Sequence, residues 1–174
     1  MFKDKTKLYI KSSEIKKICK KLGQEISADY KGQDLVIIAV LKGSLIFFAD
    51  LTRQIKIPFE SDFVRLSSYG HGTETSGTIK VLQDVSTKLN GKNVLIVEDI
   101  LDTGLTLNFF TQYLQKFGPK DVKICTLLDK PSRRRVEVQA QYCGREIEDH
   151  FVVGYGLDYN EICRNYADIY QVIT

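Results

Sequence analysis

The sequence lacks paired cysteines. Its four cysteines are scattered along the chain and form no C-x-x-C pair: Cys19, Cys125, Cys143 and Cys163. This spacing argues against a zinc site and against a disulfide framework, and it favours single thiols in a reducing compartment. We therefore expect a cytoplasmic protein.

Long hydrophobic runs are also missing. No apolar run approaches the roughly 20 residues that a membrane-spanning helix needs. The N-terminal stretch MFKDKTKLYIKSSEIKKICKK has no apolar segment followed by a cleavage site, so we expect neither a signal peptide nor a membrane partner. The net charge of +3, from 25 basic and 22 acidic residues, is too balanced to indicate nucleic-acid binding by itself.

Repeats, low-complexity tracts and linkers are absent as well. The 174 residues, 43% hydrophobic and 27% charged, are typical of a globular protein with one substantial core. We therefore expect a single domain over residues 1–174.

Apolar patterns alternate between strand and helix. Residues 35–41 (LVIIAVL) are continuously apolar and rich in β-branched side chains, which is typical of a strand covered on both faces. Residues 12–27 show apolar positions at helical spacing, with a serine available as N-cap. Further strands are expected at 60–66, 78–84, 94–99, 122–128 and 151–156, and further helices after residue 43 and from about 105 to 117. The alternation predicts an α/β fold with a doubly wound, mostly parallel sheet flanked by helices.

Charged and small residues follow four of the apolar runs. They are Lys42-Gly43, Glu98-Asp99, Asp129-Lys130 and Asp158. In sheets of this class ligands bind at the carboxyl ends of the strands, near the point where the strand order reverses. We therefore expect these residues to share one site.

The turn Asp102-Thr103-Gly104-Leu105-Thr106 has the composition of a loop around a phosphate monoester, with backbone N–H groups at a helix N-terminus. It is neither a P-loop nor a G-x-G-x-x-G motif. An N-cap whose acids complement the helix dipole would explain Asp102 alone, but not Glu98-Asp99 before it. A sugar phosphate explains both, because the carboxylates can accept bonds from ribose hydroxyls or hold Mg²⁺.

The stretch VLIVEDILDTGLTL resembles the signature of phosphoribosyltransferases that use 5-phosphoribosyl 1-diphosphate. The stretches AVLKGSLIFFADL, LLDKPSRR and FVVGYGLDYNEICRN resemble the hypoxanthine-guanine branch, and with the SSYG loop they span roughly residues 36–165. The resemblance implies a type I phosphoribosyltransferase fold with a small hood and a flexible lid loop. It also implies purine salvage: Mg²⁺-dependent transfer of the 5-phosphoribosyl group to N9 of hypoxanthine or guanine, giving IMP or GMP and diphosphate. A homodimer or homotetramer is expected, and no nucleic-acid partner.

The resemblance also implies roles for the residues of the donor site. The ribose lies over Glu98 and Asp99, which are candidate Mg²⁺ ligands, and Asp102 is the general acid/base toward purine N7. The 5′-phosphate lies in the turn Asp102, Thr103, Gly104, Leu105 and Thr106. Many relatives have lysine at the position of Leu105, which matters little if that side chain points away. Diphosphate meets Lys42, Gly43 and Arg164, and the peptide before the lysine is often cis.

For the base, the resemblance places Lys130 at the exocyclic oxygen, Phe151 against the purine ring and Val152 at its edge through backbone groups. Asp158 lies near the purine and a second Mg²⁺. Sequence alone favours a surface position for Lys130 and core positions for Phe151 and Val152. The polar loop 67–78 is the expected lid, with Ser68 and Tyr69 reaching the substrate.

Two alternatives stay open at this point. The chain could be a regulator of the same fold that binds nucleic acid, although the run Ser132-Arg133-Arg134-Arg135 better suits a solvated or interface face. It could also be a phosphoribosyltransferase for another base, such as xanthine.

Overall fold

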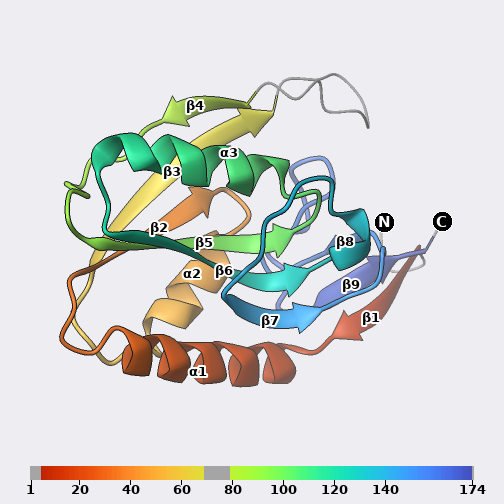
Figure 1. The fold of residues 1–174 in the computed structure, drawn as a ribbon. Helices are drawn as coiled ribbons and strands as arrows, with labels where there is room; N and C mark the ends of the chain where they lie inside the picture. Colours follow the sequence, from red (N-terminus) through yellow and green to blue (C-terminus); the bar gives the residue numbers. More distant parts are fainter. Residues whose placement is uncertain (1–4, 69–78, 174) are drawn as a thin grey trace.

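A six-stranded sheet forms the centre of the protein (Figure 1), which we describe from a computed structural model covering residues 5–68 and 79–173. The strand order is β4-β3-β2-β5-β6-β7, and every neighbouring pair is parallel except β3 and β4. The predicted mostly parallel sheet is confirmed. Its strands are β2 (Leu35–Leu41), β3 (Glu60–Ser68), β4 (Ile79–Gln83), β5 (Asn93–Leu101), β6 (Asp121–Asp129) and β7 (Tyr142–Glu146).

Helices cover both faces of this sheet, because its central strands are apolar on both sides. Helices α1 (Ser12–Asp29) and α2 (Leu45–Thr52) pack on one face, and α3 (Leu105–Leu114) with the short 3₁₀ turn 115–117 packs on the other (Figure 1). Within β2, alternate residues enter opposite cores: Ile37 packs with the α1–α2 side and Ile38 with the α3 side. Within the described ranges, no helix has both the length and the apolar character needed to cross a membrane.

The strand order reverses between β2 and β5. The chain leaves β2 through α2 to β3 on one side, and leaves β5 through α3 to β6 on the other. The loops that follow β2 and β5 therefore meet. A Cβ atom at Gly43 would overlap the Asp99 carboxylate, and one at Gly156 would overlap the Gly43 carbonyl. Glycine is required for this close approach of three segments.

A separate three-stranded sheet lies beyond the carboxyl ends of β5, β6 and β7 (Figure 1). It contains β1 (Thr6–Ile10), β9 (Ile169–Val172) and β8 (Val152–Val153) in that order, all antiparallel. The prediction of a core strand over 151–156 is wrong. Strand β8 has only two residues. It ends because the next three, Gly154, Tyr155 and Gly156, take positive φ values of 101°, 51° and 100°.

Two further details differ from the sequence-based expectations. Strand β7 at the edge of the main sheet was not predicted, because its sequence YCGRE has little apolar pattern. Helix α1 does not begin at a serine N-cap: Lys11 is the N-cap, and the Asp168 carboxylate accepts a hydrogen bond from the Ser12 N–H at 2.6 Å. An acid 156 positions away thus serves the role expected of a local side chain.

Candidate active site

The predicted phosphate turn forms a small cavity at the N-terminus of α3. The cavity has a volume of about 120 Å³, and Gly104, with φ of +82°, is the N-cap of the helix. The first N–H groups of a helix have no partner within it and attract anions. Leu105 does not line the cavity, as expected if its side chain points away. The lining residues are Glu98, Ile100, Leu101, Asp102, Thr103, Gly104, Thr106 and Leu107.

Arg134 braces the outside of this turn. Its guanidinium donates to the carbonyl oxygens of Leu101, at 3.1 Å, and of Asp102, and it forms an ion pair with Asp129. The run 132–135 was predicted to form a solvated or interface face. The Arg134 side chain is only 17% exposed, so a solvated position is wrong for this residue, while Arg133 and Arg135 are exposed. A fork of fixed donors suits this task, because one guanidinium can hold two carbonyls and a carboxylate together.

Glu98 and Asp99 lie inside β5 rather than beyond it, near its carboxyl end. Burial raises the pKa of the Glu98 carboxyl well above its usual range, and the Asp99 charge adds to this effect. Burial also raises the pKa of Asp99, while the Arg164 guanidinium acts in the opposite direction. Two adjacent acids whose charged forms are disfavoured by burial would be stabilised by a cation or by hydroxyl donors.

The donor set at this acidic pair fits magnesium shared with a substrate. Among the residues that the structure describes, no three or more His, Cys, Asp or Glu side chains form a metal cluster. Mg²⁺ is usually held by one or two carboxylates together with substrate phosphates and waters. Glu98 and Asp99 could supply the protein part of such a site. Asp158, the third predicted metal ligand, instead pairs with Arg164 at 2.8 Å.

The two predicted diphosphate cations converge on one glutamate. The Leu41–Lys42 peptide is cis, as the family resemblance implied. The Lys42 ammonium lies 2.6 Å from the Glu161 carboxylate, and the Arg164 guanidinium lies 3.6 Å from the same oxygen. The structure thus brings Lys42, Gly43 and Arg164 to the edge where β2 and β5 end, and it adds Glu161, which the sequence did not single out.

On the purine side, Lys130 is buried, with 6% exposure, so the surface position favoured by sequence alone is wrong. Its ammonium lies 3.6 Å from the Asp149 carboxylate. Arg133 connects this acid to the turn, because it lies 3.6 Å from Asp149 and 3.3 Å from Asp102. An alternating series of charges, Asp102–Arg133–Asp149–Lys130, therefore links the predicted general base to the predicted base reader.

The aromatic predicted to stack on the base is open to solvent. Phe151 is 51% exposed, so its expected core position is wrong, whereas Val152 is buried as periodicity suggested. The Phe151 ring meets Tyr159 edge-on at 5.8 Å between centroids. An exposed aromatic ring offers a face on which a flat apolar ligand can pack.

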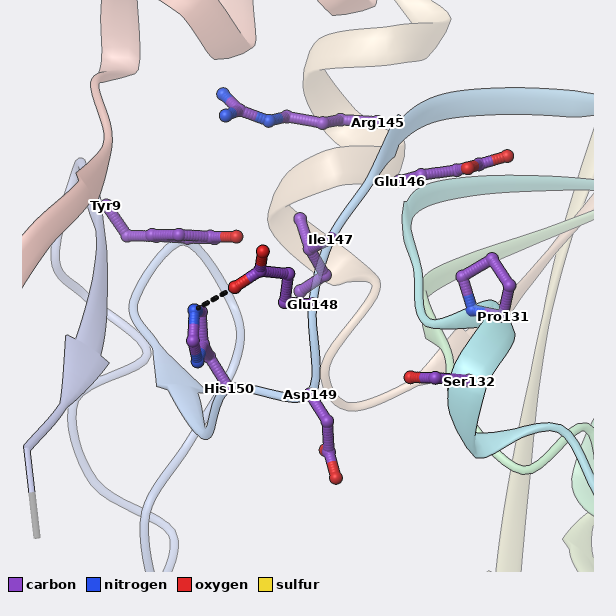
Figure 2. Close-up of a pocket in the computed structure, with 9 residues that line it drawn as sticks. All are labelled: Tyr9, Pro131, Ser132, Arg145, Glu146, Ile147, Glu148, Asp149 and His150. Carbon is purple, nitrogen blue, oxygen red and sulfur yellow. Dashed lines mark ion pairs between the residues drawn. The ribbon is translucent and has the colours of Figure 1, made fainter.

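A larger open cavity of about 680 Å³ lies next to this region but contains none of the predicted site residues. Figure 2 shows Glu148 and His150 facing each other below the Tyr9 ring, and the His150 Nε2 atom lies 3.0 Å from a Glu148 carboxylate oxygen. Asp149 points away from that pair (Figure 2), in keeping with its contacts to Lys130 and Arg133. This cavity and the cavity of the phosphate turn share no lining residue and are distinct.

Comparison with known proteins agrees with this geometry. The model of the phosphoribosyl transferase domain family matches residues 8–160. A hypoxanthine-guanine phosphoribosyltransferase of Staphylococcus epidermidis is 46% identical over 165 residues, which cover 95% of this chain and 92% of that protein. The chain belongs to the hypoxanthine-guanine phosphoribosyltransferase family.

Solved structures of this family share the whole fold. A hypoxanthine phosphoribosyltransferase from Staphylococcus aureus superposes with a TM-score of 0.93 at 43% identity, covering 97% of this chain and 92% of that one. A hypoxanthine-guanine phosphoribosyltransferase from Bacillus anthracis, solved with HEPES in its active site, gives 0.90 at 45% identity and 97% coverage of both chains. The family and the type I phosphoribosyltransferase fold predicted from the sequence are confirmed.

The lid prediction falls mostly outside the described residues. Ser68 is the last residue of β3, but its side chain, Tyr69 and residues 70–78 are not described. The roles predicted for Ser68 and Tyr69 therefore stay predictions.

Arg134→Gln is expected to destabilise the fold and weaken use of the ribosyl donor. It removes the guanidinium that donates to the Asp102 carbonyl and pairs with Asp129, whereas the Leu101 carbonyl keeps its hydrogen bond from the Lys130 N–H at 2.9 Å. The loss costs about 2–4 kcal/mol of unfolding free energy after allowance for partial exposure. The KM for the donor, measured below the melting temperature, is expected to rise more than kcat falls. Arg135→Gln is the matched control, because that side chain is exposed. Equal effects of the two substitutions would contradict a bracing role.

Proposed function

We propose that this chain is a purine salvage enzyme that transfers the 5-phosphoribosyl group of 5-phosphoribosyl 1-diphosphate to N9 of hypoxanthine, guanine or both. The products are IMP or GMP and diphosphate. One observation carries the proposal: an anion cavity at the α3 N-terminus, an acidic pair, two cations and a buried lysine lie along the carboxyl edge of one sheet.

Each part of the donor matches one part of this edge. The 5′-phosphate fits the cavity of the turn, where helix N–H groups and the hydroxyls of Thr103 and Thr106 can donate. The ribose hydroxyls then face Glu98 and Asp99, which can accept. The diphosphate lies between Lys42 and Arg164, whose charges offset the charge of the leaving group.

The reaction breaks the bond between C1 of the ribose and the diphosphate oxygen, and it forms a bond from the same carbon to purine N9. Positive charge builds on the ribose ring as the leaving group departs, so carboxylates near the ring stabilise it. Asp102, at the mouth of the turn, takes up the proton from purine N7 as N9 attacks, so that the purine of the product is neutral. Lys130 donates to the 6-oxygen, and Phe151 packs on the ring.

Glu98 and Asp99 would hold Mg²⁺ together with the donor, and a second ion would lie near Asp158. When bound, Mg²⁺ supplies positive charge that stabilises the departing diphosphate. We further propose that residues 1–174 act as one catalytic domain of a homodimer or homotetramer in the cytoplasm. Its four free cysteines suit a reducing compartment. Light scattering on the purified protein would measure the oligomeric state.

A single assay tests the proposed reaction. Purified protein is incubated with the donor, Mg²⁺ and hypoxanthine, guanine or xanthine, and nucleotide formation is followed by absorbance. We expect IMP or GMP to form. Nucleotide formation from xanthine instead would indicate a phosphoribosyltransferase for that base. Failure to use any 6-oxopurine would favour the regulator of the same fold.

The acidic pair is expected to be needed for donor use. We predict that excess chelator abolishes activity, and that Glu98→Gln combined with Asp99→Asn raises the donor KM by at least tenfold, because both carboxylates lose their charge. Calorimetry of donor binding with and without Mg²⁺ gives a readout independent of turnover. An unaltered donor KM in the double variant would contradict the assignment, as would full activity in chelator.

A further inference from the structure

Glu161 contacts both cations that the proposed function assigns to diphosphate. One of its carboxylate oxygens accepts a hydrogen bond from the Lys42 ammonium at 2.6 Å and lies 3.6 Å from the Arg164 guanidinium. The pKa of Glu161 is lowered, mainly by Lys42 and secondarily by Arg164. An internal carboxylate thus fills the position of an anion.

The backbone of a tight turn places Glu161 there. Tyr159 and Ile162 exchange backbone hydrogen bonds of 3.0 and 3.1 Å, and the two residues between them have φ values of +48° and +68°. Two-residue turns with both central φ values positive favour asparagine and glycine. Asn160 fits that preference, but Glu161 does not. Glu161 therefore occupies a position whose positive φ glycine would adopt at lower cost.

The contact can open without disturbing the rest of the site. The Glu161 side chain is 65% exposed and can turn into solvent. Arg164 stays fixed when this happens, because it also donates to the Gly156 carbonyl at 2.7 Å and pairs with Asp158 at 2.8 Å. Both cations would then face an incoming anion.

We infer that Glu161 occupies the anion position between Lys42 and Arg164, and that the diphosphate group must displace it to bind. This inference rests on the proposed function. Glu161 acts through the two cations and is a positioning residue: it holds them together before diphosphate binds, and it lowers the affinity for diphosphate and for the donor.

Calorimetry with inorganic diphosphate and Mg²⁺ tests the inference on the wild type and on Glu161→Gln. The exposed ion pair competes weakly, so its removal is expected to lower the Kd for diphosphate by about two- to fivefold. The donor KM falls by a similar factor, whereas the KM for hypoxanthine does not change. A residue that only stabilises the turn would not improve binding of either ligand.

Two further variants complete the test. Glu148→Gln removes the same charge at a side chain that is 84% exposed and outside the site, and it is expected to leave the diphosphate Kd unchanged. Glu161→Gly suits the positive φ of the turn, and it is expected to tighten binding even if Glu161→Gln folds poorly. An unchanged or weaker Kd in Glu161→Gly overturns the inference. If the wild type neither binds diphosphate nor forms nucleotide, the proposed function fails instead.

Discussion

Replacing Asp102 with asparagine is expected to lower kcat by about 10²–10⁴-fold, the range that general acid/base catalysis contributes. Asparagine keeps the shape of the side chain but cannot take up the proton from purine N7. The turn is held by backbone groups and by Arg134, which donates to the Asp102 carbonyl rather than to its carboxylate. The donor KM is therefore expected to change much less than kcat.

A second variant separates this proton transfer from the loss of an ion pair. Asp102 lies 3.3 Å from Arg133, and both side chains are partly exposed. Arg133→Gln breaks the same pair while leaving the carboxylate, and an exposed pair contributes at most about 1 kcal/mol. We therefore expect Arg133→Gln to retain kcat within about tenfold. Equal kcat losses in the two variants, or unchanged turnover in Asp102→Asn at saturating substrate, would remove Asp102 from the catalytic role.

The fold could be predicted largely because its strands have strong local patterns. Residues 35–41 and 94–97 are apolar at every position and rich in β-branched side chains, which is typical of a strand covered on both faces. The turn after β5 could be predicted from its glycine. Gly104 takes the positive φ that a tight entry into α3 needs.

What the sequence did not reveal depends on distant partners. Arg134 is the second of three consecutive arginines, and no local pattern distinguishes the one that turns inward to Leu101 and Asp102. Glu161 reaches Lys42 across 119 positions of sequence. The signal that could have suggested it is an acid next to Asn160 in a tight turn. These contacts arise only when loops from separate strands meet at the sheet edge.

Adenine is expected to be rejected by about 10⁴–10⁵-fold in kcat/KM relative to hypoxanthine, because a site that hydrogen-bonds one substrate group excludes the analogue lacking it. Lys130 can only donate, and it is 6% exposed. The 6-oxygen of hypoxanthine, guanine or xanthine accepts its hydrogen bond. Adenine presents an amino group there, which would set donor against donor in a site with little water.

Lys130→Met tests whether this lysine reads the base. Methionine keeps an unbranched apolar stem, one heavy atom shorter than lysine, but it cannot donate a hydrogen bond. Asp149, which is 52% exposed, can be hydrated after the change. The kcat/KM for hypoxanthine is expected to fall far more than the kcat/KM for adenine. The ratio of the two values therefore decreases. Asp149→Asn is the matched control, because it removes the acid 3.6 Å from the ammonium and leaves the donor in place. If Lys130→Met keeps the full preference, or if the wild type uses adenine as well as hypoxanthine, another group selects the base.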